Sequence, residues 1–305
     1  MEKTPTPELD AFIFRIERQR RYSPYTVRNY RKAVEEWLAW LKRTGYAGGD
    51  FSKADKRVAR AYVAELGSRC EHSTLHNKIS AVRSFYKFLV QTGDAEADPF
   101  SLVRLPKLKR ELPVFLGESS MPALLSAPKN AGSERADKTD SVRESLCIEL
   151  LYGAGLRVSE LCKMKWRDVD FSTNTARVLG KGSKLRLCPF GEKAGEVLRL
   201  WRGEFSAATS PDDFVITLKS GKPAYPRYVQ RMLKKYLAMS GLPSDITPHK
   251  LRHSFATHLV NNGIDLRSLQ EMLGHASLST TQIYTHLGTK KLVEEHRASH
   301  PRAKL

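Results

Sequence analysis

Through the first hundred residues, apolar side chains recur every three to four positions, the spacing of amphipathic helices. Ser23 followed by Pro24 is typical of a helix start, and Gly45 and Gly93 follow the last periodic residues of two segments. The pattern predicts helices over 8–20, 24–44, 55–66 and 74–92, and a short one after Pro99. This part of the chain should therefore fold as a compact bundle of four or five helices.

The periodicity stops between Leu105 and Phe115, in the string LPKLKRELPVF. Two prolines interrupt helix formation there, and the basic side chains favour solvent. We expect a linker at 106–115 that separates a domain of residues 1–105 from a second of residues 116–305. The alternative is an ordinary loop within one domain.

The second part of the chain mixes helical and strand patterns. We expect a helix over 142–152, a short helix from Val158 or Ser159, and further helices from Arg227 onward. Strands are predicted at 175–179, 184–188 and 214–218, the first two joined by a turn at 180–183. The fold class is therefore mainly α, a helical bundle followed by a mixed α/β domain with a small antiparallel sheet.

Charge narrows the choice of partner. The net charge is +18, and it is shared between the two parts: residues 1–110 carry 22 basic and 13 acidic groups, and the remainder carries 29 and 20. Each part is therefore +9. Two basic domains suit a polyanion held from two sides, so nucleic acid is the favoured partner over a merely basic protein.

Other compartments and cofactors are not indicated. The chain has no apolar run of membrane-spanning length, and its first residues, MEKTPTPELD, lack the apolar region of a secretory signal, so we expect a cytoplasmic protein without a membrane partner. The four cysteines form no C-x-x-C pair and are expected to be reduced. His249 and His253 have the spacing of a metal pair, but the H-E-x-x-H pattern is absent, so no metal is expected.

His249 and Arg252 are the best-defined candidates for binding an anion. Thr247 and Pro248 predict a helix start, which places both side chains near the helix N-terminus and three positions apart. Free N–H groups and the helix dipole favour an anion there. Taken alone, however, a surface histidine and arginine would be the simpler interpretation.

Three further candidates depend more on their neighbours. Arg157 follows a G-A-G break that lets the backbone approach a ligand, although a salt bridge to Glu160 is an alternative role. Lys181 is at the tip of the predicted hairpin, where Lys184 and Arg186 are competitors. His275 follows Gly274, which should end a helix over 266–273.

Together, the strings GAGLRVSEL, LGKGSKLR, TPHKLRHSFATHL and LGHASLSTTQIYTHL resemble the tyrosine recombinase (phage integrase) family, and most closely its Xer group of chromosome-dimer-resolving recombinases. The resemblance spans nearly the whole chain. It implies a SAM-like, core-binding N-terminal bundle and a C-terminal catalytic domain. The catalytic set that it implies is Arg157, Lys181, His249, Arg252, His275 and the nucleophile Tyr284.

The resemblance also implies a reaction and its partners. Tyr284 would form a 3′-phosphotyrosyl bond with double-stranded DNA at an inverted-repeat, dif-like site, without a cofactor. Four protomers would act together, as a homotetramer or with a second recombinase, associated with the nucleoid and with a DNA translocase as the candidate activator. A C-terminal helix at about 289–300 would be exchanged between protomers; packing on its own domain is the alternative.

Three other functions remain to be weighed against this one. A plasmid or mobile-element integrase of the same family would use the same chemistry. A type IB topoisomerase is disfavoured by the helical N-terminal part, and a non-catalytic DNA-binding regulator is disfavoured by the complete set of six residues.

Overall fold

A computed structural model describes residues 6–19, 22–108, 114–131, 135–180, 185–274 and 286–303. The chain divides into two compact units, Met1–Glu111 and Leu112–Leu305. Each unit has its own buried apolar cluster. The predicted fold class is confirmed, since helices dominate both units and the only sheet among the described residues is small and antiparallel.

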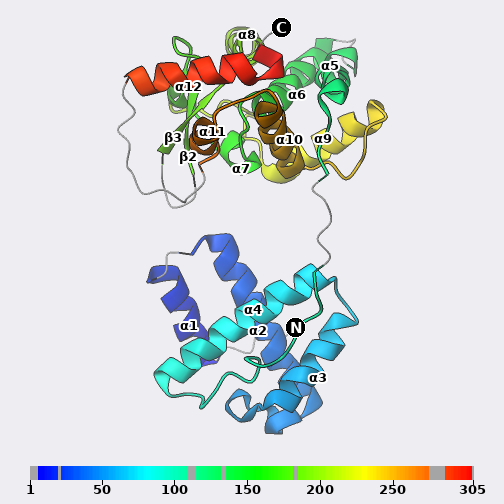
Figure 1. The fold of residues 1–305 in the computed structure, drawn as a ribbon, viewed down its shortest axis with the longest axis vertical. Coiled ribbons are helices and arrows are strands. Elements are labelled where there is room, and N and C mark those ends of the chain that lie inside the picture. The colour runs from blue at the N-terminus through cyan, green and yellow to red at the C-terminus, as the bar shows by residue number, and fades with distance from the viewer. Residues whose placement is uncertain are drawn as a thin grey trace. The chain divides into compact units, whose positions relative to one another are not determined.

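The N-terminal unit is a helical bundle (Figure 1). Its helices are α1 (Pro7–Arg18), α2 (Pro24–Thr44), α3 (Lys56–Gly67) and α4 (His72–Thr92), with short 3₁₀ turns at Tyr46–Gly49 and Phe51–Lys53. The Ser23 side chain caps α2, and Gly45 and Gly93 end α2 and α4 in the left-handed conformation. Trp37 lies at the centre and donates to the Tyr86 hydroxyl, 3.2 Å away. The short helix predicted after Pro99 is not formed; residues 99–102 are turns instead.

The C-terminal unit is built around the buried helix α6 (Figure 1). Helices α5, α8, α9 and α10 pack on α6, and a three-stranded sheet lies beside them. The helices are α5 (Met121–Ala131), α6 (Arg135–Gly153), α7 (Val158–Leu161), α8 (Glu192–Leu200), α9 (Pro226–Met239), α10 (Pro248–Asn261), α11 (Leu266–Leu273) and α12 (His286–Ser299). Single turns lie at Glu118–Ser120, Trp166–Asp168, Trp201–Phe205 and Pro301–Ala303.

The sheet has the strand order β1 (Val169–Asp170), β2 (Thr175–Leu179) and β3 (Leu185–Pro189), all antiparallel. β2 and β3 pair as the sequence predicted, with Val178 opposite Arg186. Helix α11 lies against β3. This contact matters because it brings the end of α11 next to side chains of the sheet.

Two predictions about this unit are corrected by the structure. Residues 214–218 are not a strand: they make only isolated bridges, Lys165 with Phe214 and Thr217 with Pro223. Val215 and Ile216 are both buried, so this segment lacks the one-sided burial of a surface strand. Helix α6 begins at Arg135, earlier than the predicted start near Val142. The prediction missed the first turns because they are polar and carry no apolar periodicity.

The described residues include no helix long and apolar enough to cross a membrane.

Candidate active site

The site begins at the break after α6. Gly155 has φ +58°, and a Cβ at this position would come within 2.5 Å of the Phe255 ring on α10. Glycine is therefore required twice, for its backbone conformation and for the close approach of the chain to α10. This packing carries the chain directly from α6 to Arg157, which precedes α7.

Arg157 is partly exposed and is tied to its own helix. Its guanidinium pairs with Glu160 at 2.8 Å, and its backbone N–H donates to the other carboxylate oxygen at 2.7 Å. The salt bridge that the sequence suggested as an alternative role is therefore present. Because 37% of the Arg157 side chain remains exposed, the ion pair orients the guanidinium without enclosing it.

Arg252 reaches the same place from α10. Thr247 caps this helix by accepting from the Lys250 N–H at 3.2 Å, and Pro248 occupies the first position, as predicted. The Arg252 side chain is buried and donates to the carbonyl oxygens of Gly155 and Leu273. The second nitrogen of Arg157 also approaches the Leu273 oxygen, at 3.5 Å. The two arginines thus converge on the last residue of α11.

Glu160 is the residue that links them, and sequence analysis missed its central role. Its carboxylate is almost fully buried and receives two hydrogen bonds from Arg186 on β3, at 2.6 and 2.7 Å. Arg252 lies 3.8 Å from the same carboxylate. Arg186 was named only as a competitor of Lys181 for the DNA, whereas its guanidinium is 3% exposed and faces inward.

The electrostatics of this cluster follow from its composition of three arginines and one glutamate. Burial by itself would raise the pKa of Glu160, but hydrogen bonds and charge from Arg186 and Arg157 outweigh burial, so its pKa is lowered. Burial and the neighbouring Arg157 and Arg186 lower the pKa of Arg252 to about 10. With three guanidinium groups and one carboxylate, the cluster presents a net positive charge to an anion.

His249 lies in the first turn of α10, three residues before Arg252 in the sequence. It is exposed, in contrast to the buried Arg252. An imidazole that is open to solvent can exchange a proton with a bound ligand.

The other candidates are Lys181 with its competitor Lys184, His275 and Tyr284, and all of them lie outside the described residues. Leu179 and Leu185 are paired at the ends of β2 and β3. Gly274 ends α11 with φ +64°, directly after the carbonyl that Arg252 holds.

The C-terminal helix α12 packs on its own unit, against α10, α11 and β3. Its anchors are two buried histidines. The Nε2–H of His296 donates to the Gly153 carbonyl at 2.7 Å, and the His300 ring stacks on the His296 ring with 4.9 Å between centroids. Exchange of this helix between protomers is not tested by a single chain and stays a prediction.

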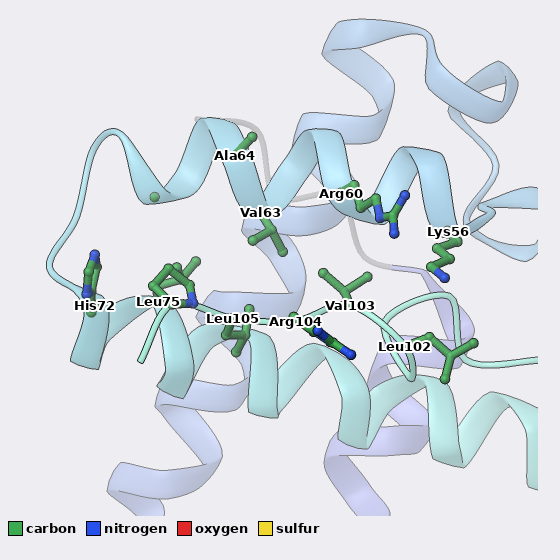
Figure 2. Close-up of a pocket in the computed structure, with 12 residues that line it drawn as sticks. Lys56, Arg60, Val63, Ala64, His72, Leu75, Leu102, Val103, Arg104 and Leu105 are labelled. Atoms are coloured by element: carbon green, nitrogen blue, oxygen red, sulfur yellow. The ribbon is translucent and has the colours of Figure 1, made fainter. Parts of the chain in front are cut away.

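A separate groove of about 920 Å³ lies in the N-terminal unit, between α3, the start of α4 and residues 102–106 (Figure 2). Its floor is apolar, and Lys56, Arg60 and Arg104 project along it. These three cations take part in none of the ion pairs found among the described residues. Among the described residues, those that line the groove include basic and apolar side chains and no carboxylate.

Comparison with known proteins gives a consistent result for both units. Residues 115–291 match the model of the phage integrase family, and residues 9–93 match the phage integrase N-terminal SAM-like domain. The tyrosine recombinase XerC of Bacillus subtilis (strain 168) is 37% identical over 298 residues, which cover 96% of this chain and 95% of that protein. The XerC of Pediococcus pentosaceus is 40% identical over 291 residues, with 93% and 95% covered.

Among solved structures, the XerH site-specific recombinase bound to a palindromic difH substrate, in a post-cleavage complex, has a TM-score of 0.72 with this chain. The identity is 20%, and the match covers 94% of this chain and 83% of that one. This likeness concerns the fold.

Proposed function

Since this chain belongs to the phage integrase family of tyrosine recombinases, we propose that it cleaves and rejoins double-stranded DNA at a specific site through a phosphotyrosyl intermediate. The observation that carries the proposal is the convergence of Arg157 and Arg252, from helices almost a hundred residues apart, around one buried carboxylate. Their fixed positive charge suits a phosphate, which guanidinium groups bind through paired donors.

In the proposed reaction, the Tyr284 oxygen attacks the scissile phosphorus and the bond from phosphorus to the 5′-oxygen breaks. A phenol has a pKa of about 10, so the attack requires removal of its proton, which His249 accepts. Lys181 donates a proton to the departing 5′-oxygen. The products are a 3′-phosphotyrosyl bond and a free 5′-hydroxyl.

Arg157 and Arg252 bind the nonbridging oxygens and offset the charge that builds up in the transition state, and His275 adds a hydrogen bond to one of them. The arginines supply the fixed positive charge that this step needs. Attack by a 5′-hydroxyl of the partner duplex then reverses the chemistry. Because the phosphotyrosine retains the bond energy, joining consumes no nucleotide.

We further propose the biological setting that the Xer relatives suggest: resolution of chromosome dimers at an inverted-repeat, dif-like site. Exchange between two duplexes needs four protomers, either identical or paired with a second recombinase, with the exchanged segment at about 289–300. Association with the nucleoid and activation by a DNA translocase belong to the same proposal.

A nicked duplex bearing the target site tests the chemistry. The nick lets a short fragment diffuse away after cleavage, so the enzyme should accumulate as a covalent DNA adduct that survives denaturation and maps to Tyr284. The Tyr284→Phe variant is the matched control, because it removes one oxygen atom. It should bind the site with unchanged affinity and form no adduct. Absence of the adduct from the unmodified protein on its true site would refute the proposal.

A further inference from the structure

We infer that Arg186 is a positioning residue for the two arginines proposed to bind the scissile phosphate, an inference that rests on the proposed function. Arg186 contacts neither of those arginines by hydrogen bond. It acts through Glu160 and through the end of α11, both of which they share with it.

The first contact is the paired hydrogen bond to Glu160. The two nitrogens of Arg186 bind the two carboxylate oxygens at 2.6 and 2.7 Å, a geometry that fixes the plane of the carboxylate. The carboxylate in turn holds Arg157 at 2.8 Å. Without Arg186, the buried Glu160 would retain only Arg157 at 2.8 Å and Arg252 at 3.8 Å as ionic partners, and these two cations would be drawn inward to compensate.

The second contact is with the end of α11. The Arg186 Nε donates to the Met272 carbonyl at 2.8 Å, and Arg252 donates to the next carbonyl, that of Leu273. The side chain also packs so closely that a Cβ on Gly274 would lie 2.8 Å from the Arg186 Cδ. Arg186 therefore sets where α11 ends, immediately before His275.

The burial of the Arg186 side chain indicates that these contacts belong to the folded core rather than to a variable surface arrangement. Arg186 is 3% exposed, and each of its three guanidinium nitrogens makes a hydrogen bond inside the protein, so its side chain is not placed as a DNA contact. The cluster holds a net charge of about +2 because Arg186 balances Glu160 and leaves Arg157 and Arg252 unbalanced. A buried cation that neutralises a carboxylate beside two binding cations keeps them available for an anionic ligand.

The test is single-turnover cleavage of the nicked duplex by Arg186→Met at saturating protein. We expect site binding within about threefold of the unmodified protein and adduct formation slowed on the order of 100-fold, the effect of displacing catalytic groups by about 1 Å. Arg186→Lys retains the charge and should recover part of the rate.

The matched control is Arg143→Met. Arg143 is equally buried and paired, with Asp140 and Tyr228, but lies outside the site. It should lose comparable thermal stability and keep a normal cleavage rate per bound protomer. If both variants slow cleavage equally, or if Arg186→Met cleaves at the normal rate, the inference is overturned.

A double variant tests whether Arg186 acts through Glu160. When Glu160→Gln has removed the carboxylate charge, adding Arg186→Met should slow cleavage by much less than the roughly 100-fold expected in the unmodified protein, because only the contact of Arg186 with the end of α11 remains to be lost. Multiplying effects would mean an independent role and would contradict the inference. Failure of the unmodified protein to form any adduct would instead refute the proposed function, so the two failures are distinguishable.

Discussion

At the scale of single residues, the site depends on a few positions where the chain has no freedom to vary. Gly155 allows α10 to touch the chain that leads to Arg157. Three arginines, Arg157, Arg186 and Arg252, form ion pairs with the Glu160 carboxylate. Its pKa is lowered because hydrogen bonds and charge from Arg186 and Arg157 outweigh the effect of burial. Arg186, which carries no distinctive signal in the sequence, stabilises the ionised form of that buried carboxylate.

Gly155→Ala should destabilise the C-terminal unit by about 2–4 kcal/mol, because the new methyl group combines a disfavoured positive φ with a clash against Phe255. Urea unfolding measures the change. Gly153→Ala is the control: no atom lies within 4 Å of its added Cβ, and alanine favours the end of α6. Equal losses in the two variants would show that close packing at Gly155 does not limit stability.

At the scale of elements, α12 is anchored by two histidines, His296 and His300, whose burial disfavours the protonated form. Burial lowers the pKa of His296 to about 4, and burial and the adjacent His296 hold the pKa of His300 well below its ordinary value. Both rings sit against Phe255 of α10, with Arg302 and His258 also acting on His300. The docking of α12 therefore depends on pH.

A histidine whose folded pKa lies below its unfolded value stabilises the fold fully above pH 6.5, and this contribution is lost as the pH falls. We expect the free energy of unfolding to decrease between pH 7.5 and 5 by up to about 2 kcal/mol from His296, one pKa unit being about 1.4 kcal/mol. Urea unfolding at both pH values measures it. His296→Gln should reduce this pH dependence, and an unchanged slope would contradict the role of His296.

At the scale of the whole molecule, the two units divide the charge and the chemistry differently. Each part of the chain carries a net charge of +9, whereas all six proposed catalytic residues belong to the C-terminal part. In the N-terminal unit, helices frame a groove lined by cations without ionic partners among the described residues (Figure 2). We therefore expect the N-terminal unit to contribute DNA binding, and the C-terminal unit to contribute both binding and reaction.

This division predicts the salt dependence of DNA binding. Each phosphate neutralised adds about −0.9 to the slope of log affinity against log salt. A protein of residues 112–305 alone should show roughly half the slope of the full chain, because half of the excess charge is removed. Fluorescence anisotropy with a labelled duplex over a salt series measures both slopes. Equal slopes would mean that the N-terminal unit does not neutralise phosphates.

Elements with local signals could be predicted closely from sequence. Helix α11 covers residues 266–273 and ends before Gly274 as expected, and Thr247 and Pro248 begin α10. Capping and turn formation depend on side chains within a few positions, so they can be read without the fold. The error at 214–218 has the opposite cause: strand pairing depends on a distant partner, and this segment finds only single bridges.

By itself, the sequence determined the helical bundle, the small hairpin sheet, the basic charge of both parts and the family, because each follows from local pattern, composition or motif. Only the tertiary structure decided which arginines share a carboxylate. Glu160 and Arg186 are 26 residues apart and meet because β3 lies against α11 beside α7. Long-range ion pairs arise from packing, and burial converts Arg186 from a possible DNA contact into an internal support of the site.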